Sequence, residues 1–314
     1  MIIIKRLQEG LNRYLKVDAV VVTYNRLEKL KECINSLLLM NLQKIIVINN
    51  NSNDGTNDYL KELSINNRNV ISYKLRENVG GAGGFNFGLK KFIENSDSDY
   101  VWIMDDDTIP TAESLEKLVH GIEKIPSEKR GFAVGQIYWT DGSLARMNIP
   151  TYFSIKEYES EDIKTIQEAS FVAILFPRET IVSVGYPIKD FFIWGDDVEY
   201  TRRICKLGLI GIQVIDAEIL HKMSSNNSTN IIHENQDIGR IKRYFFDFRN
   251  RIYLSKEKGT IFLLKTLCGR GVWLFRILFY KNNHKLLKSR ILFKGTIEGL
   301  RFNPMKEKVN RKYR

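Results

Sequence analysis

The chain has 314 residues, of which 43% are hydrophobic, enough for one large domain with appendages and a sizeable core. Its cysteines (Cys33, Cys205 and Cys268) are far apart with no CxxC pair, which argues against a zinc site or a disulfide framework and fits a reducing cytosol. The charge of +11 is uneven, because residues 240–314 carry 21 Lys and Arg against 4 Asp and Glu, a net of +17, and the remainder has a net of −6.

No apolar stretch approaches the roughly 18 residues of a membrane-spanning helix. The apolar run at 1–4 is too short for a signal peptide. We expect residues 1–17 to form an N-terminal arm, in which 5–16 is either a short helix or part of the arm.

The first part of the chain after this arm alternates apolar strands with helices. The predicted elements are strand 18–26, helix 27–40, strand 44–48, helix 57–63 and strand 70–75. Near-continuous apolar strands in this alternation are typical of a parallel sheet that is covered on both faces. Ligands of such sheets bind beyond the carboxyl ends of the strands. Polar runs at 23–26 and 49–56 follow two of these strands, which predicts a ligand site there.

A glycine-rich segment at 76–88 follows the third strand and leads into a helix. We expect a loop here whose glycines allow close approach to a ligand, with the N–H groups of the following helix available to an anion. No Lys-Ser/Thr pair follows the glycines and the spacing is not GxGxxG, so the segment matches neither a P-loop nor a dinucleotide-binding fingerprint.

The next predicted strand, 98–104, runs directly into Asp105, Asp106 and Asp107. Adjacent carboxylates repel one another and Asp has poor strand propensity, so a structural reason for the triplet is weak. Mg2+ or Mn2+ would remove the repulsion, and these cations commonly share carboxylates with substrate phosphates. We therefore predict a metal–diphosphate site, with a solvated acidic turn as the alternative.

The remaining elements before residue 240 are less regular. They are predicted as a strand at 131–139, a polar surface insertion near the acceptor side at 141–168, a strand at 169–177, a short helix at 181–186, and a strand at 210–215 that the segment 219–222 follows.

A second acidic cluster, Asp196, Asp197 and Glu199, follows Trp194-Gly195 at the start of a predicted helix. Helix capping explains one acid but not three. A carboxylate beside an aromatic ring suits a general base that takes a proton from a sugar hydroxyl. His221, after the last strand, is either a structural histidine or a nitrogen ligand for Mn2+.

Together these motifs resemble the GT-A fold inverting glycosyltransferases of glycosyltransferase family two, over roughly residues 18–250. The resemblance rests on 21–26, 48–56 and the 105–107 triplet. The combination of 78–85 with Trp194-Gly-Asp-Asp-Val-Glu and His221 looks most like the galactofuranosyltransferase branch. It implies an α/β GT-A fold with a mostly parallel central sheet and helices on both faces. Together with the uneven charge, this predicts a catalytic domain at 18–239 and a basic amphipathic helical region at 240–314 that docks on a membrane or a partner.

The resemblance also implies residue roles. Asp105 and Asp107 would hold the metal and the sugar ring, with His221 completing the metal site. Asp197 would be the base, and Asp196 and Glu199 would shape the acceptor or donor sugar. The implied donor-binding residues are Thr23, Asn25, Arg26, Asn49, Asn50, Asn78, Gly81, Gly84, Asp105, Asp106 and Trp194, with Asn49 or Asn50 standing where the family often has Asp.

The implied reaction is transfer of a hexose, with galactofuranose favoured, from a UDP-sugar to a hydroxyl of a cell-surface glycan or lipid-linked acceptor. Mn2+ or Mg2+ would neutralise the departing diphosphate while the base activates the hydroxyl for one displacement that inverts the anomeric centre. A dTDP-rhamnose transferase and a sugar nucleotidyltransferase are the alternatives. The nucleotidyltransferase would favour a basic Gly-rich loop near the N-terminus, which this chain lacks.

The basic region 240–314 mixes bases with aromatic residues. The segment 261–280 predicts a helix with a Trp/Phe/Leu face and a basic face, which is typical of helices in a membrane interface. We predict a cytoplasmic protein bound peripherally to the anionic inner face of the cell membrane, with a core-packing helix as the alternative. Nucleic-acid binding is not favoured because the region has no recognisable module, and an oligomer is left open.

Overall fold

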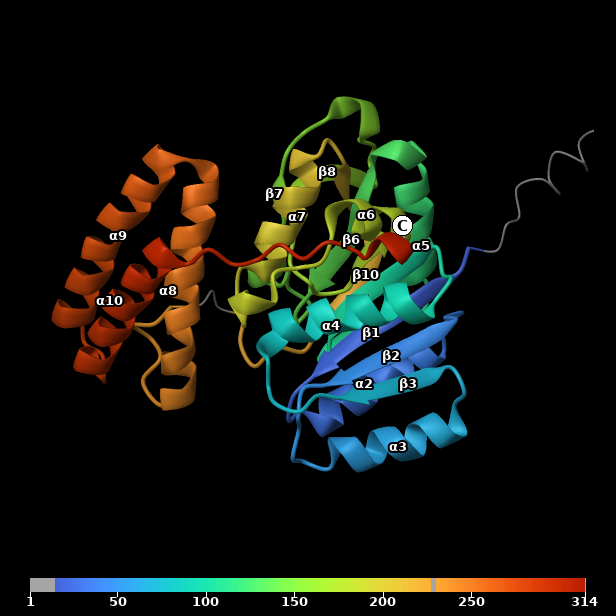
Figure 1. The fold of residues 1–314 in the computed structure, drawn as a ribbon, viewed down its shortest axis with the longest axis horizontal. Coiled ribbons are helices and arrows are strands. Elements are labelled where there is room, and N and C mark those ends of the chain that lie inside the picture. Colours follow the sequence, from blue (N-terminus) through green and yellow to red (C-terminus); the bar gives the residue numbers. More distant parts are fainter. Residues whose placement is uncertain (1–14, 227–229, 314) are drawn as a thin grey trace, which may run out of the picture.

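A computed structural model describes residues 15–226 and 230–313 (Figure 1). The strands are β1 Val17–Thr23, β2 Lys44–Asn49, β3 Val70–Lys74, β4 Tyr100–Asp105, β5 Thr108–Pro110, β6 Arg130–Tyr138, β7 Thr151–Tyr152, β8 Ile163–Glu168, β9 Ile174–Pro177 and β10 Ile210–His221. The helices are α2 Leu27–Leu38, α3 Thr56–Asn66, α4 Gly80–Asn95, α5 Ser114–Glu123, α6 Arg178–Val184, α7 Asp196–Lys206, α8 Ile238–Lys258, α9 Thr260–Phe279 and α10 Lys285–Arg301. Most of the predicted arm falls on residues 1–14, outside the described residues.

One sheet joins these strands in the order β3-β2-β1-β4-β9-β6-β10-β8-β7, with β5 paired to β10 off this path. β1 runs parallel to both β2 and β4, and Val22 lies opposite Ile48 on one side and Asp105 on the other. Because these strands end at the same edge, the register alone brings Thr23, Asn49 and Asp105 together. The predicted mostly parallel sheet is confirmed, with β9 inserted antiparallel between β4 and β6.

Helices cover both faces of the sheet, as predicted. One apolar layer contains Leu30 of α2, Leu60 of α3 and Leu118 of α5. The opposite layer contains Phe92 of α4 and Ile204 of α7. Alternate strand residues point to opposite faces, so near-continuous apolar strands supply both layers at once.

The expected glycine-rich loop is wrong, because Gly80 already begins α4. A Cβ on Gly84 would lie 2.5 Å from Val22 Cγ1, and one on Gly88 would lie 2.4 Å from Val20 Cγ1. Gly84 and Gly88 thus let α4 pack closely against β1, which accounts for these two glycines without a ligand.

Three other element predictions change in detail. The strand expected at 169–177 begins only at Ile174. The strand expected at 210–215 continues to His221 as one strand, β10, whose pairing with β6 is interrupted by a bulge after Val214. Part of the supposed surface insertion at 141–168 joins the sheet as β8, because β8 pairs antiparallel with β10.

Helices α8, α9 and α10 form a bundle beside the sheet (Figure 1). Residues 302–313 then run back across the sheet domain, where Glu307 lies 2.7 Å from Lys90 Nζ and 3.1 Å from Lys189 Nζ. The C-terminal region therefore contacts the sheet domain at both of its ends, and the predicted boundary at 239/240 stays a prediction. Within the described ranges, no helix is apolar over a length that would cross a membrane.

Candidate active site

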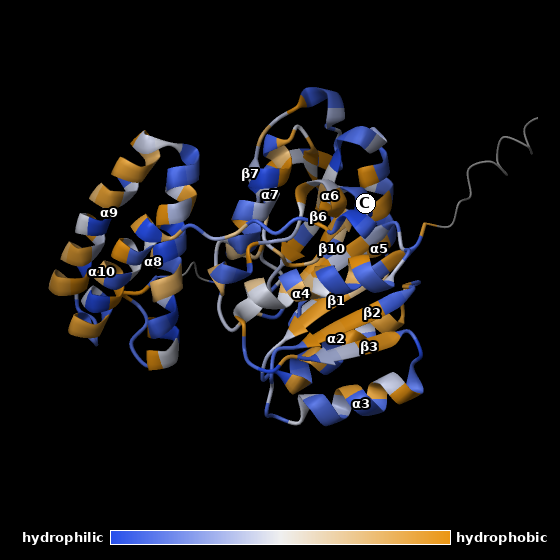
Figure 2. Cartoon of the chain, viewed as in Figure 1, coloured by the Kyte–Doolittle hydropathy of each residue, from blue (hydrophilic) through white to orange (hydrophobic). Residues whose placement is uncertain are grey.

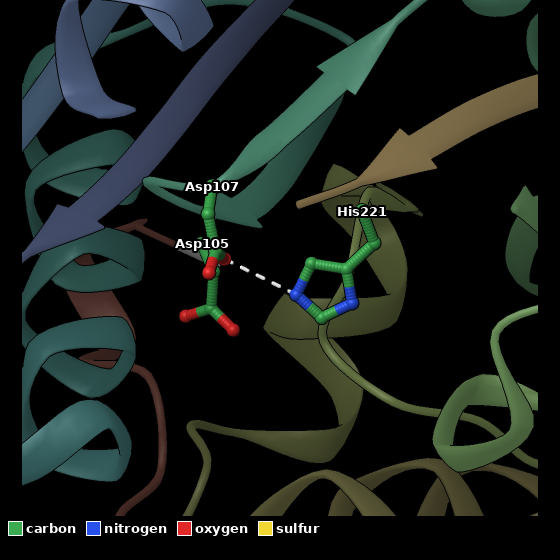
Figure 3. Close-up of side chains that lie close together, drawn as sticks. All are labelled: Asp105, Asp107 and His221. Atoms are coloured by element: carbon green, nitrogen blue, oxygen red, sulfur yellow. Dashed lines mark hydrogen bonds and ion pairs between the residues drawn. The ribbon is translucent and has the colours of Figure 1, made fainter. Parts of the chain in front are cut away.

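Asp105, Asp107 and His221 come together at the edge of the sheet. One potential ligand atom of each lies within 4.8 Å of the others. Figure 3 shows the His221 ring directed at the Asp107 carboxylate, with Nε2 3.1 Å from Oδ1. The pairing of Thr108 with His221 and the bond from the Lys222 N–H to the Asp107 carbonyl bring the two segments together. The predicted metal ligands are therefore neighbours in space although they come from distant parts of the chain.

Asn148 orients the His221 ring. Its Oδ1 lies 2.9 Å from His221 Nδ1, while its own Nδ2 donates to Ser170 Oγ at 2.9 Å. With the amide turned this way, Nδ1 keeps its proton and Nε2 is the nitrogen left to face Asp107. A histidine that ligates a metal is usually held by such a bond from its other nitrogen. Nothing in the sequence marks Asn148, which lies within the polar insertion.

Basic and hydroxyl groups surround the carboxylates. Thr23 Oγ1 donates to Asp106 Oδ2 at 2.8 Å. Arg26 Nη1 lies 2.8 Å from Asp107 Oδ2 and 3.3 Å from Asp106 Oδ1, and Lys29 Nζ lies 3.2 Å from Asp107 Oδ2. The structure thus unites Thr23 and Arg26 with the acidic triplet, and it adds Lys29, which the sequence patterns did not single out.

The three aspartates differ in their proton affinity. Burial, followed by the charges of Asp107 and Asp106, raises the pKa of Asp105 well above its ordinary value. Burial also raises the pKa of Asp106 to about 6, against the opposing charge of Arg26. For Asp107, burial is outweighed by the hydrogen bond and charge of His221 and by Arg26, so its pKa lies well below the usual range. Asp107 is the carboxylate of the three that stays ionised to the lowest pH.

Asn25 and Asn50 brace the loops that follow β1 and β2. Asn25 Oδ1 accepts a bond from the Asn53 N–H at 2.8 Å. Asn50 Oδ1 accepts from the Val79 N–H, and its Nδ2 donates to the Gly80 carbonyl, both at 2.9 Å. These contacts hold the loops at the carboxyl ends of β1 and β2 in place, so both residues have a structural role there.

Asn49 and Asn78 lie at the same edge. Asn49 Oδ1 accepts from the Ser52 N–H at 2.8 Å, while its buried Nδ2 has no hydrogen-bond partner. Asn78 Oδ1 accepts from the Gly80 N–H at 2.8 Å. A Cβ at Gly81 would meet nothing within 4 Å. The donor-binding roles of these residues stay predictions, and Asn49 Nδ2 is a buried donor with no partner among the described residues.

The second acidic cluster begins α7. The backbone before it has positive φ at Phe192 (64°), Trp194 (64°) and Gly195 (93°). Burial raises the pKa of Asp197 to about 6 although backbone N–H groups, Val198 first, lower it. Burial and the neighbouring Asp197 raise the pKa of Asp196 well above its ordinary value. Asp197 is thus the member of the pair suited to accept a proton near neutral pH.

Glu199 has a structural partner instead. Its carboxylate is 4% exposed and lies 2.9 Å from Arg203 Nη2, with Lys306 Nζ at 3.7 Å. Arg203 in turn donates to the carbonyls of Val184 and Tyr186 at 3.0 and 2.9 Å. The Glu199 carboxylate is thus paired within this network, and its role in shaping the acceptor or donor sugar stays a prediction.

Helix α8 holds the segment that leads to the second acidic cluster. Asn250 Nδ2 lies 3.0, 3.1 and 2.8 Å from the carbonyl oxygens of Phe191, Ile193 and Trp194. Arg249 Nη2 also donates to the Phe191 carbonyl, at 3.1 Å. Sequence reasoning missed both residues, and the only signal available was a polar pair within an aromatic helix.

A cavity of about 650 Å³ lies between the start of α7 and helices α8 and α9. Trp194 and Asp197 line it from the sheet domain, and Asn250, Arg270 and Trp273 line it from the helical bundle. The predicted base therefore faces a space large enough for sugar units, built jointly by two parts of the chain.

Known proteins resemble this chain in sequence. A family model described as Glycosyl transferase family 2 matches residues 18–179. Galactofuranosyltransferase GlfT1 of Mycobacterium tuberculosis (strain H37Rv) is 28% identical over 279 residues, covering 83% of this chain and 89% of that protein. The protein of the same name from Mycolicibacterium smegmatis is 25% identical over 281 residues, covering 83% and 90%.

Solved structures resemble it in fold. GalNAc-T7 with UDP, GalNAc and Mn2+ matches with a TM-score of 0.57 at 13% identity, covering 77% of this chain and 51% of that one. TarS of S. aureus matches with a TM-score of 0.52 at 15% identity, covering 92% and 44%. The chain thus spans about half the length of these two structures, and the likeness shows the fold alone. With a family match over just over half of its length, the chain belongs to glycosyl transferase family 2 and is a glycosyltransferase with the GT-A fold.

Proposed function

We propose that this glycosyltransferase moves galactofuranose from UDP-galactofuranose to a hydroxyl of a cell-surface glycan or lipid-linked acceptor, with inversion and with the help of a divalent cation. The observation that carries the proposal is the meeting of Asp105, Asp107 and His221 at the sheet edge. The galactofuranosyl donor is supported by relatives named galactofuranosyltransferase that align with 83% of the chain.

The side chains of Asp105, Asp107 and His221 suit a divalent cation. Two carboxylates and one imidazole are ligands that Mn2+ accepts readily and Mg2+ accepts through its oxygens. When bound there, the cation would neutralise negative charge on the departing diphosphate. Arg26 and Lys29 add positive charge on the same side of the carboxylates. Asn148 keeps the His221 ring in the orientation that presents Nε2.

Asp197 would remove the proton from the acceptor hydroxyl as that oxygen attacks the anomeric carbon. A group with a pKa of about 6 is mostly ionised at pH 7 and still basic enough to accept a proton. The bond to the diphosphate breaks on the opposite face of the sugar, so one displacement inverts the centre. Trp194 presents an aromatic surface in the same cavity.

The test is a donor comparison with the full chain. UDP-galactofuranose, UDP-galactopyranose and dTDP-rhamnose are incubated separately with Mn2+ or with EDTA, and the nucleoside diphosphate released is measured. We expect Mn2+-dependent turnover with UDP-galactofuranose as the preferred donor. Preference for dTDP-rhamnose would contradict the proposal that UDP-galactofuranose is the donor. Equal turnover in EDTA would contradict the proposed metal dependence, and pyrophosphate release would indicate a nucleotidyltransferase.

We also propose that the helical bundle binds the anionic inner face of the cell membrane from the cytoplasmic side. Figure 2 shows hydrophobic positions along α9 and α10. Exposed apolar residues there include Phe262, Phe275, Phe279 and Phe293. Exposed bases accompany them: Lys265, Lys281, Arg290 and Lys294. Apolar side chains would insert into the interface, and each base would add about 1 kcal/mol near anionic lipid.

Vesicle co-sedimentation tests this binding. We expect the chain to bind anionic vesicles more strongly than neutral ones, and to bind less at high salt because the attraction is screened. The double variant Phe275→Ser and Phe279→Ser should lose binding. Leu39→Ser is the matched control, because Leu39 is 84% exposed at the end of α2. Failure of the unaltered chain to bind either vesicle type would contradict the proposal.

A further inference from the structure

A buried arginine on α9 lines the cavity beside Asp197. Arg270 is 8% exposed, and its guanidinium lies 4.7 Å from the centre of the Phe248 ring. Nη2 donates to the Phe248 carbonyl at 3.2 Å, while Nε has no hydrogen-bond partner. Burial lowers the pKa of Arg270 to about 10, so the group is charged at neutral pH. A buried charge with unused donors is unfavourable unless a partner satisfies it.

The other cations that line the cavity are paired with carboxylates. Glu168 lies 2.7 Å from Arg202 Nη2 and 3.3 Å from Lys258 Nζ. Asp247 lies 2.7 Å from Arg251 Nε. In the part of the chain that the structure describes, no such carboxylate contact reaches Arg270, and Asp247 acts on it only through space. Arg270 is therefore the cavity's unneutralised cation.

We propose that the cavity binds an acceptor carrying a phosphate ester, with the phosphate held by Arg270 and a sugar hydroxyl presented to Asp197. This inference deepens the proposed function and rests on it for the role of Asp197. A guanidinium binds phosphate oxygens through charge-assisted bonds, with a geometry that lysine does not reproduce. Trp194 and Trp273, which line the same cavity, offer apolar surfaces for the sugar between the two polar groups.

The phosphate could belong to a lipid-linked sugar or to a phosphodiester in a glycan polymer. The position of α9 bears on the choice, because this helix carries Arg270 and Trp273 on the cavity side and exposed apolar residues such as Phe275 and Phe279 elsewhere on its surface. A tailed and an untailed probe can separate the two sources.

The test is calorimetric binding of three probes: octyl glucosyl phosphate, methyl glucosyl phosphate and octyl glucoside. The full chain is used with saturating UDP and Mn2+, so that phosphate does not enter the donor site. We expect both phosphates to bind roughly tenfold or more tightly than octyl glucoside, the size expected of hydrogen bonds to a charged group. Tighter binding of the octyl than of the methyl phosphate would indicate that the phosphate belongs to a lipid-linked sugar. Equal binding of the two would indicate a phosphodiester in a glycan polymer.

Variants link this preference to Arg270. Arg270→Gln should abolish it, Arg270→Lys should keep part of it, and Lys265→Gln should leave it intact, because Lys265 is an exposed cation on the same helix that does not line the cavity. Circular dichroism identifies any variant that fails to fold, and Arg270→Lys then carries the comparison. Absence of the preference in the unaltered chain, its persistence in Arg270→Gln, or no binding of any probe would overturn the proposal. Phosphate binding through Arg270 without any nucleotide-sugar turnover would instead overturn the proposed function and leave the subsite standing.

Discussion

The sheet edge that carries the candidate metal ligands Asp105, Asp107 and His221, called the metal edge below, is held in place differently from the segment 191–197 that leads to Asp197. At the metal edge, the positions of Thr23 and Asp105 are set by the register of β1 and β4, because these two strands end side by side. Segment 191–197 has no strand to hold it. The carbonyl groups of Phe191, Ile193 and Trp194 accept bonds from Asn250 of α8, and the Phe192 carbonyl accepts one from the Ala82 N–H of α4. Regular hydrogen bonding positions the first group of residues, and individual side chains from the C-terminal helices position the second.

Backbone geometry sharpens the contrast. Phe192 and Trp194 both have φ of 64°, a conformation that costs roughly 1–3 kcal/mol for a non-glycine residue and persists only where surrounding contacts impose it. Asn250 supplies such contacts on both sides of Phe192. Damage at the metal edge should therefore remove donor binding, whereas damage at α8 should slow the reaction while donor binding survives.

Replacing Asp107 with alanine should have the largest effect. Asp107 contacts His221, Arg26 and Lys29, so its loss removes the ionised ligand at the centre of the metal edge. We expect transfer and Mn2+-dependent UDP binding to fall to background with the fold intact, measured by calorimetry, turnover and circular dichroism. The control is Asp58→Ala, whose exposed carboxylate pairs only with Lys61 among the described residues. Near-normal turnover would refute the metal assignment.

Replacing Asp197 with asparagine should cut turnover by roughly a hundredfold or more, the effect of losing a general base. UDP binding should be unchanged, since the metal edge is intact. Steady-state kinetics and UDP calorimetry measure the two effects. If Asp196→Asn is severe and Asp197→Asn mild, the roles of the two acids must be exchanged.

Removing Asn250 tests the helical support. Asn250→Ala should lower kcat by up to roughly a hundredfold, because a displacement of about 1 Å at a reacting group has effects of that size. The UDP dissociation constant should change little. Lys242→Ala, an exposed change on the same helix, is the control. Equal loss of UDP binding and kcat would show a general structural defect in place of a local one.

The dependence of activity on pH should report the ionisation of Asp197. Because the pKa of Asp197 is raised to about 6, its carboxylate is protonated and inactive as a base at pH values where an ordinary aspartate is ionised. The kcat/KM of the unaltered enzyme should therefore fall about tenfold per pH unit below about 6. Asp197→Asn should lack this decline, and its persistence in that variant would assign the titration to another group.

The smallest expected effect is on stability alone. Gly88→Ala would place a Cβ 2.4 Å from Val20 Cγ1, so we expect the free energy of unfolding to drop by roughly 1–3 kcal/mol, as for other overpacked sites. Gly81→Ala meets no atom within 4 Å and should change it by less than about 1 kcal/mol, in the stabilising direction. Urea unfolding compares the two, and equal losses would mean that close packing of α4 on β1 is not the reason for these glycines.

The sequence by itself determined the alternation of strands and helices and the identity of the strand-end polar groups. Apolar periodicity is a local property, and parallel strands bring their carboxyl ends to one edge whatever the intervening segments contain. The acidic triplet and its family resemblance therefore predicted Asp105 and Asp107 together with His221, and the structure brings the three side chains together.

Only the tertiary structure decided which polar residues support the site. Asn148 contacts His221, Asn250 contacts the Trp194 carbonyl, and Arg270 lines the cavity together with residues from distant segments. The structure also shows a helix where a glycine-rich loop was expected, and an ion pair between Glu199 and Arg203. Such contacts depend on how completed elements pack, and a polar side chain carries no periodic signal of the partner it will meet across the fold.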